Sequence, residues 1–245
     1  LDKEGIAVPK EGWTLEEFYT ICKKLTKDTN GDGQLDQFGS TEYTWKEALA
    51  ANGGHLFQGG MLKLTAPEVK ESLTFLQKLE DLNKNYKVSS KDFDQGKVAF
   101  YPMTLAQYRT YKPYPYHVSK YSNFTWTCIP MPAKSKTTKA TLVTTTSFAM
   151  SARSSHSKLA WELMQLLTED PEIQQTLFAQ SQGISVMPQV VKSRSSKDLL
   201  QVDDFGTDSL TNQTLNRIME QDVESSPKNV SKEVLEKLDY LIGNA

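Results

Sequence analysis

An amphipathic segment that runs directly into a loop rich in Asp and Gly constrains this chain more than any other feature. The stretch, residues 12–39, reads GWTLEEFYTICKKLTKDTNGDGQLDQFG. Thr14 and Glu17 have the spacing of a capping box, in which each side chain bonds the other residue's backbone N–H. The apolar residues recur at the spacing of one helical face: Phe18, Ile21, Cys22 and Leu25. We therefore predict a helix that ends near Lys27 and packs this face into a core.

The loop after this helix has the spacing of a calcium-binding EF-hand loop. The expected ligands are the side chains of Asp28, Asn30, Asp32 and Asp36 and the backbone carbonyl of Gln34. Gly33 stands where such a loop turns sharply, but the twelfth position, which normally carries a bidentate Glu, is Gly39. The alternative is a polar turn without an ion, because Asn and Gly tolerate left-handed backbone. A bound Ca²⁺ would be structural, since no neighbouring motif offers chemistry for it to assist.

The charge balance argues against a strongly charged partner. The chain has 245 residues, of which 28 are basic and 30 acidic, for a formal net charge of -2. Neither sign forms long runs, so the sequence predicts no nucleic-acid partner and no acidic membrane surface. A hydrophobic content of 38% is enough for a sizeable core.

The ends and the cysteines say little about targeting. No apolar run approaches the length of a membrane span, and the first residues, LDKEGIAVPKEGW, do not resemble a signal peptide. The chain starts without Met and in what reads as a loop, so we expect a fragment or a processed form. Cys22 and Cys128 fit buried thiols better than a disulfide framework.

Periodicity predicts a mixed, helix-rich α/β class. The expected helices are 45–52, 67–85, 104–112, 155–169, 171–181, 209–224 and 230–243. The expected strands are 98–103, 124–130 and 142–151, the last two as a hairpin or adjacent pair. No internal repeat or low-complexity tract occurs.

No catalytic constellation is visible. His55, His117 and His156 lack ligand spacing to one another or to a cysteine, and the common nucleophile and zinc motifs are absent. Glu42 and Glu47 form a carboxylate pair of a kind found in glycosidases, but such pairs are common by chance. We therefore predict a binding protein and not an enzyme.

Aromatic residues are concentrated in polar, loop-like surroundings, as a saccharide pocket requires. They are Tyr43, Trp45, Tyr101, Tyr108, Tyr111, Tyr114, Tyr116 and Trp126. An aromatic ring stacks on the C–H face of a sugar while amides, carboxylates and hydroxyls bond its edge. Tyr43 and Trp45, beside Glu42, are the better candidates, whereas Tyr101 and Trp126 also fit core positions in strands.

Taken in order, these segments resemble the extracellular solute-binding proteins of ABC importers, in the carbohydrate-binding, maltose-binding-protein-like family. The resemblance rests on GWTLEEFYTICKKLTKDTNGDGQLDQFG, ANGG, APEVKESLTFLQKL, FDQGKVAFYPM, IPMPAKSKT, TTTSFAMSARSSHSKLAWELMQLLTEDPEIQQTL and GISVMP. It covers the chain from Val8 to Ile242. The chain departs from the family at YPMTLAQY, where Thr104, Gln107 and Tyr108 stand in place of the usual stacking Trp, which leaves the sugar undefined.

The resemblance implies a periplasmic-binding-protein-like α/β lobe. Residues 8–100 and 150–192 would form mainly the C-terminal lobe, 98–150 would hold strands near the crossings between lobes, and 193–245 would form C-terminal helices. Most of the N-terminal lobe would be missing, together with a signal peptide and the lipid-anchored cysteine of Gram-positive members.

The implied function is capture of a sugar or oligosaccharide outside the cell and its delivery to the membrane permease subunits of an ABC transporter. The full-length protein would be a cell-surface lipoprotein or periplasmic. The expected ligand contacts are Glu42, Tyr43, Trp45, Thr104, Gln107, Tyr108, Thr144, Thr145 and Thr146. The alternative is a calcium-dependent carbohydrate-binding or adhesion module without a transport role.

Overall fold

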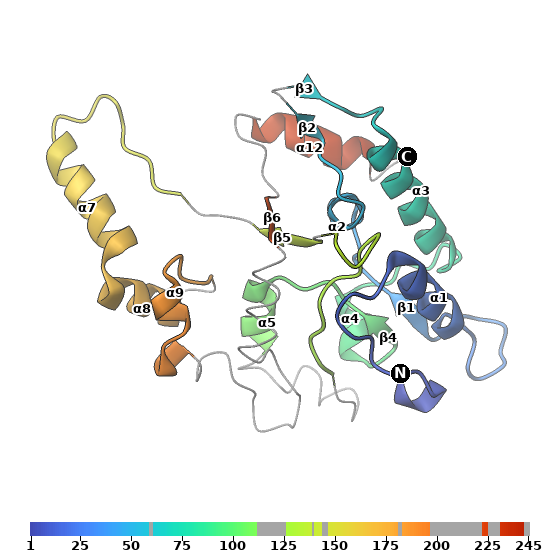
Figure 1. Ribbon diagram of the computed structural model, residues 1–245. Helices are drawn as coiled ribbons and strands as arrows, with labels where there is room; N and C mark the ends of the chain where they lie inside the picture. Colours follow the sequence, from blue (N-terminus) through green and yellow to red (C-terminus); the bar gives the residue numbers. More distant parts are fainter. Residues whose placement is uncertain are drawn as a thin grey trace.

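A computed structural model describes residues 1–58, 61–111, 126–138, 140–143, 147–180, 183–196, 222–224 and 231–242. Figure 1 shows the arrangement of its elements. In chain order they are η1 (Asp2–Glu4), α1 (Leu15–Leu25), β1 (Phe38–Ser40), α2 (Trp45–Ala51), β2 (Phe57–Gln58), β3 (Met61–Leu62), α3 (Pro67–Asp81), α4 (Ser90–Asp94), β4 (Val98–Phe100), α5 (Leu105–Tyr111), β5 (Thr141–Val143), α7 (Ser157–Glu169), α8 (Pro171–Gln180), α9 (Pro188–Val191), β6 (Asp222–Glu224) and α12 (Lys232–Ile242). The mixed, helix-rich class is confirmed.

Helix α1 begins with the capping box that its sequence predicts. The backbone N–H of Thr14 donates to the Glu17 carboxylate at 2.6 Å, and the N–H of Glu17 donates to the Thr14 hydroxyl at 3.2 Å. The helix buries Phe18, Cys22 and Leu25 on one face, as expected. The predicted start of this helix and its buried face at Phe18, Cys22 and Leu25 are therefore confirmed, and the helix ends at Leu25, two residues before the predicted end.

Strands β1 and β4 form a parallel pair behind α1, with Phe38 opposite Val98 and Ser40 opposite Phe100. Gly39 lets α1 lie directly on this pair, because a Cβ at residue 39 would overlap the backbone of Cys22, 2.7 Å from its carbonyl oxygen. This contact explains why the twelfth position of the preceding loop carries glycine. A glutamate there would separate the helix from the sheet.

An aromatic cluster fills the space between α1, β4 and α3. The Phe18 ring lies 5.5 Å from Trp13, 5.2 Å from Tyr43 and 5.5 Å from Phe100, measured between ring centroids. The Trp13 indole N–H donates to the carbonyl of Pro130 at 2.8 Å, which ties residues 130–133 to the start of α1. This cluster is the rigid base from which the loops after β1 and β4 emerge.

Helix α12 closes over α2 although almost 200 residues separate the two in sequence. Asp239 accepts from the indole N–H of Trp45 and from the ammonium group of Lys46, both at 2.9 Å. Leu238 is buried in a cluster with Leu49, Leu56 and Val69 from α2, α3 and the loop between them. The helix expected at 230–243 is confirmed, and its contacts give it a fixed place.

We expect Asp239→Ala to loosen α12. The substitution removes two bonds to a charged carboxylate, so local opening of the helix should become easier by about 1–2 kcal/mol, which is roughly 5- to 30-fold faster amide exchange. Hydrogen–deuterium exchange with mass spectrometry measures this directly. Glu236→Ala is the matched control, because Glu236 is exposed and pairs with Lys232 of the same helix. Equal exchange in both variants would contradict the docking role of Asp239.

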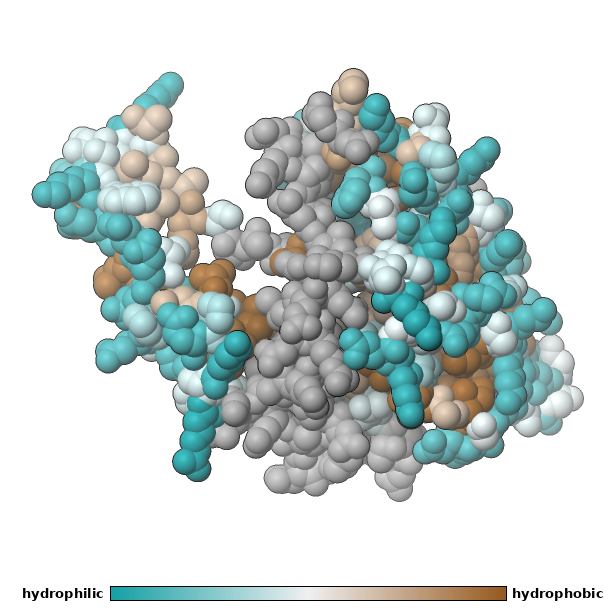
Figure 2. All heavy atoms as spheres, in the orientation of Figure 1, coloured by the Kyte–Doolittle hydropathy of each residue, from teal (hydrophilic) through white to brown (hydrophobic). Residues whose placement is uncertain are grey.

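Helices α7 and α8 extend as an arm at the left of Figure 1. None of the side chains of α7 is buried, although its length and pattern match the predicted helix. Leu159 is 66% exposed and Trp161 52% exposed, and Figure 2 shows apolar surface over this arm. The apolar face that sequence periodicity assigns to packing therefore meets solvent here.

Several predicted strands are wrong in extent or pairing. A strand was expected at 124–130, but its described part, residues 126–130, is not a strand. Pro130 and Pro132 cannot donate the backbone hydrogen bonds of a strand ladder. The alternation of apolar residues in this segment reflects their burial and not strand pairing. Of the strand expected at 142–151, β5 includes residues 142–143, residues 147–151 are not a strand, and residues 144–146 lie outside the described ranges. β5 pairs parallel with β6 and not with the described residues 126–130. The strand expected at 98–103 ends before Pro102.

The C-terminal third differs from the sequence expectation in one further place. Residues 222–224, which were expected to end a helix at 209–224, form strand β6, and residues 209–221 lie outside the described ranges. β-Pairing with β5 overrides the local helical pattern at this point. Within the described part of the chain, no helix combines the length and apolar character needed to cross a membrane.

Candidate functional site

Polar side chains that could contact a ligand come together at the carboxyl ends of β1 and β4. Because the strands are parallel and in register, the segments that follow them emerge at one edge of the sheet. Glu42 follows β1, and Tyr101 and Thr104 follow β4. Ligands of open α/β sheets bind outside the carboxyl ends of their strands. This edge is therefore the candidate ligand site.

A chain of hydrogen bonds links these segments to helices α4 and α5. The Glu42 carboxylate accepts from the backbone N–H of Ser90 at 2.9 Å. The side-chain amide of Gln107 donates to the Tyr101 hydroxyl at 2.9 Å, and its carbonyl accepts from the backbone N–H of Thr104 at 2.8 Å. The site therefore presents a carboxylate, a phenol and an amide whose positions are already fixed.

Electrostatics support a neutral phenol in this group. Partial burial raises the pKa of the Tyr101 hydroxyl, and the adjacent Glu42 carboxylate raises it further by its charge and by hydrogen bonding. Glu42 itself is exposed and has a φ of 52°, in the left-handed region that a glutamate rarely occupies. A strained residue at a strand end is typical of functional loops.

Tyr43 and Trp45 lie in the core and against α12, and not in the hydrogen-bonded group of Glu42, Tyr101 and Gln107. Tyr43 is 7% exposed in the aromatic cluster, and its hydroxyl is a buried side-chain atom with no hydrogen-bond partner among the described residues. Burial raises the pKa of this phenol. Trp45 is half-buried and donates to Asp239. Neither is shown in contact with Tyr101 or Gln107, and their role in binding stays a prediction.

Of the remaining predicted ligand contacts, one is buried and three lie outside the described residues. Tyr108 is 4% exposed and packs edge-on against Trp126, with ring centroids 6.1 Å apart. Thr144, Thr145 and Thr146 lie outside the described residues. Glu47, which pairs with Glu42 in the glycosidase interpretation, caps α2 by accepting from the backbone N–H of Thr44.

The sequence offered Tyr101 and Trp126 both as sugar-stacking aromatics and as core residues, and neither was among the expected ligand contacts. Tyr101 carries the central hydroxyl of the group, and half-buried Trp126 packs with Tyr101 against the cluster of Phe38, Phe93 and Val98. The signal that could have found Tyr101 is its place directly after a strand. Trp126 has no comparable signal in its own segment, because its contact with Tyr108 depends on tertiary packing.

The loop at 28–36 is organised around Asp28. Its carboxylate accepts from the backbone N–H groups of Gly31 and Gly33, each at 2.7 Å, and of Asn30 at 3.1 Å. These bonds, that from Gly33 foremost, hold the pKa of the exposed Asp28 carboxyl below its ordinary value. Because the folded-state pKa is lowered, the stabilising effect is present above the unfolded-state pKa and is lost as pH falls through the folded-state value.

The other expected ligands also face their own backbone. Asn30 accepts from the N–H of Asp32 at 2.9 Å, and Asp32 accepts from the N–H of Gln34 at 2.8 Å. Asp36 accepts from both the N–H and the hydroxyl of Thr29. Both carboxylate oxygens of Asp28, Asp32 and Asp36 already accept a hydrogen bond, so a cation would have to use the remaining lone pairs of these oxygens. However, across the ranges that the structure describes, no three His, Cys, Asp or Glu residues are gathered as a metal-ligand group.

Comparison with known proteins identifies a family and a fold. The model of the family described as bacterial extracellular solute-binding protein matches residues 2–202. An ABC substrate-binding protein from Listeria monocytogenes, solved in complex with cycloalternan, is 18% identical, with a TM-score of 0.66 over 99% of this chain and 60% of that chain. A maltose/maltodextrin-binding domain from Bdellovibrio bacteriovorus, bound to maltotriose, is 22% identical, with a TM-score of 0.62 over 98% and 61%.

These likenesses confirm the expected periplasmic-binding-protein-like fold. The chain spans about three fifths of the length of the two solved proteins. No curated protein matches it.

Proposed function

Because the chain belongs to the bacterial extracellular solute-binding protein family, we propose that it is part of a substrate-binding component that captures a sugar or oligosaccharide for an ABC importer. The observation that carries this proposal is the family match over residues 2–202. The full-length protein binds its solute outside the membrane, in the periplasm or as a surface lipoprotein, and delivers it to permease subunits without a chemical step.

The chemistry at the edge of β1 and β4 supports a sugar as the solute. Glu42, Tyr101 and Gln107 offer acceptors and donors for hydroxyl groups. The Tyr101 and Trp126 rings pack on the same apolar cluster, and an aromatic ring is the group that stacks on the C–H face of a sugar. The two solved proteins compared above hold cycloalternan and maltotriose. An amino acid or peptide would bring a carboxylate as well as an ammonium, and the group of Glu42, Tyr101 and Gln107 has no cation to pair with that carboxylate.

Isothermal titration of the full-length protein with a solute panel tests the proposal. The panel contains maltotriose, cycloalternan and cellotriose as sugars, with an amino-acid mixture and a tripeptide as controls. We expect saturable binding of at least one sugar and none of the controls. Binding of a control alone would overturn the proposal. Sugar binding with unchanged sugar uptake in a deletion strain would favour the carbohydrate-binding or adhesion module instead.

We further propose that loop 28–36 holds one structural Ca²⁺ through Asp28, Asn30, Asp32, Asp36 and the carbonyl of Gln34. Its support is the ligand spacing, together with the left-handed turn at Gly33, where φ is 87°. Three aspartates in nine residues repel one another without a counter-ion. The ion would stiffen the segment that leads through β1 to Glu42.

Calcium should therefore raise the melting temperature of the protein. Binding to the folded state at about 100 times the Kd stabilises it by about 2.7 kcal/mol. Asp32→Ala should abolish the rise in scanning fluorimetry, whereas Asp81→Ala, which removes an acidic group at the end of α3, should keep it. A melting temperature that does not change in millimolar Ca²⁺, or one that calcium still raises in Asp32→Ala, would favour the polar-turn interpretation of this loop.

A further inference from the structure

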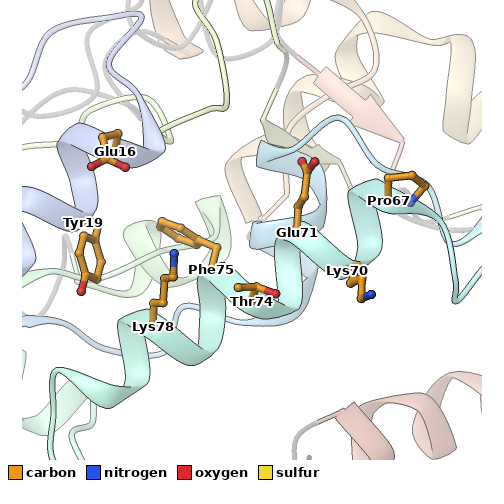
Figure 3. Close-up of a pocket in the computed structure, with 8 residues that line it drawn as sticks. All are labelled: Glu16, Tyr19, Pro67, Lys70, Glu71, Thr74, Phe75 and Lys78. Carbon is orange, nitrogen blue, oxygen red and sulfur yellow. The ribbon is translucent and has the colours of Figure 1, made fainter.

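A pocket of about 630 Å³ lies between helices α1 and α3, outside the candidate ligand site. Figure 3 shows its walls, with Glu16 and Tyr19 on α1 and Glu71, Phe75 and Lys78 on α3. None of these residues belongs to the group at the carboxyl ends of β1 and β4. The volume is within the range of about 300–1,000 Å³ typical of small-molecule sites.

The floor of this pocket is aromatic and rigid. Tyr19 and Phe75 are half-buried and both pack against the buried aromatic cluster. The Phe75 ring lies 6.1 Å from Tyr43 in a T-shaped arrangement and 6.3 Å from Phe18. Because both partners are buried, the outer surface of Phe75 is held in place by the core. Such a surface loses little conformational entropy when a flat apolar face stacks on it.

The rim is polar and balanced in charge. Glu16 lines the pocket from α1, and Lys70, Glu71 and Lys78 line it from α3, where Thr74 adds a hydroxyl (Figure 3). Glu71 is paired with Lys134 at 2.5 Å, outside the pocket lining. Two acidic and two basic side chains leave no net charge to select an anion or a cation. The lining matches a neutral ligand that has one apolar face and many hydroxyl groups at its edge.

We propose that this pocket is a second saccharide-binding site, which holds one or two sugar units of a neutral oligosaccharide on Tyr19 and Phe75. The proposal rests on the sugar-binding function above. Because the rim is exposed, the affinity is lower than at the candidate ligand site, and occupancy begins only at high sugar concentration. Such a site retains oligosaccharide near the protein surface while the primary site is filled.

Saturation-transfer difference NMR with maltotriose separates the two sites. The background is a Gln107→Ala variant of the full-length protein, in which the primary site is weakened. Thr74→Arg fills the pocket with a long side chain, and Gln77→Arg makes the same change at an exposed position of α3 outside the pocket. We expect the transfer signal to fall at least fivefold with Thr74→Arg and to stay unchanged with Gln77→Arg. Tyr19→Ala should lower it similarly.

Equal signals in the two arginine variants would overturn the proposal, as would an absence of transfer in the Gln107→Ala background. Circular dichroism of each variant shows that the fold is kept. The outcome for the pocket is independent of the primary site, because titration of the unaltered protein with maltotriose reports that site separately. Tight binding in the unaltered protein together with equal signals in the arginine variants would reject the pocket and leave the proposed function in place.

Discussion

Phe18→Ala should lower the free energy of unfolding by about 3–5 kcal/mol, the cost typical of a phenylalanine removed from a packed core. Phe18 is 2% exposed and lies at the centre of the aromatic cluster. Its ring meets Trp13, Tyr43, Phe75 and Phe100 at centroid distances of 5.2–6.3 Å. The cavity left behind is bounded by helix α1 and strand β4, which cannot collapse without moving the candidate ligand site.

Urea unfolding followed by circular dichroism measures this loss. Phe18→Leu keeps most of the volume and should cost less than about 1.5 kcal/mol. Phe148→Ala is the matched control for removal of a ring, because Phe148 is 47% exposed and should change stability by less than about 0.5 kcal/mol. A loss of under about 1 kcal/mol for Phe18→Ala would contradict a central role for this ring.

Gln107→Ala should weaken sugar binding by about 1–3 kcal/mol, or roughly 5- to 150-fold. The substitution removes the amide that joins Tyr101 to the start of α5, and with it a donor and an acceptor at the site. Tyr101→Phe should weaken binding less, because the ring remains and only the hydroxyl between Glu42 and Gln107 is lost. Isothermal titration with the sugar that the panel identifies measures both effects.

Tyr86→Phe is the control for loss of a tyrosine hydroxyl. Tyr86 is 40% exposed and its ring lies 5.8 Å from Phe38, away from the hydrogen-bonded group, so affinity should not change. Equal affinities for the unaltered protein and Gln107→Ala would remove the carboxyl edge of β1 and β4 from the proposal. Melting temperatures of each variant separate a change in binding from a change in folding.

For Tyr43 and Trp45, affinity and stability measured side by side decide whether the side chains bind ligand or only support the fold. We predict that alanine at either position weakens binding by about 1–3 kcal/mol. Because Tyr43 is buried and Trp45 holds Asp239, each substitution also removes packing or a hydrogen bond. Unchanged affinity in both alanine variants, with lowered stability, would assign the two side chains to the fold alone.

The sequence predicted best what is decided locally. The capping box of Thr14 and Glu17, the buried face of α1 and the Pro67 start of α3 all depend on residues within a few positions of one another. Each of these was confirmed. The signals are strong because a helix satisfies its backbone from its own neighbours.

What depends on distant partners was not predictable in the same way. The parallel pairing of β5 with β6 joins segments about 80 residues apart, and nothing in residues 124–151 distinguishes it from a hairpin. Similarly, the role of Tyr101 depends on Gln107 and Glu42 meeting at one edge of a sheet. Tyr43 was the better candidate by its loop-like surroundings, yet its side chain is buried in the core.

The loop between α1 and β1 has a consequence for engineering. Its two ends are tied by hydrogen bonds between the backbones of Lys27 and Gln37 at 3.0 and 3.2 Å, while a Cβ at Gly31 would meet no atom within 4 Å. Each doubling of a closed loop costs only about 0.6 kcal/mol. A circularly permuted fluorescent protein placed at Gly31 would sit on a clamped stem that leads directly into β1. Solute binding at the proposed site around Glu42 would then change the fluorescence intensity of the inserted protein.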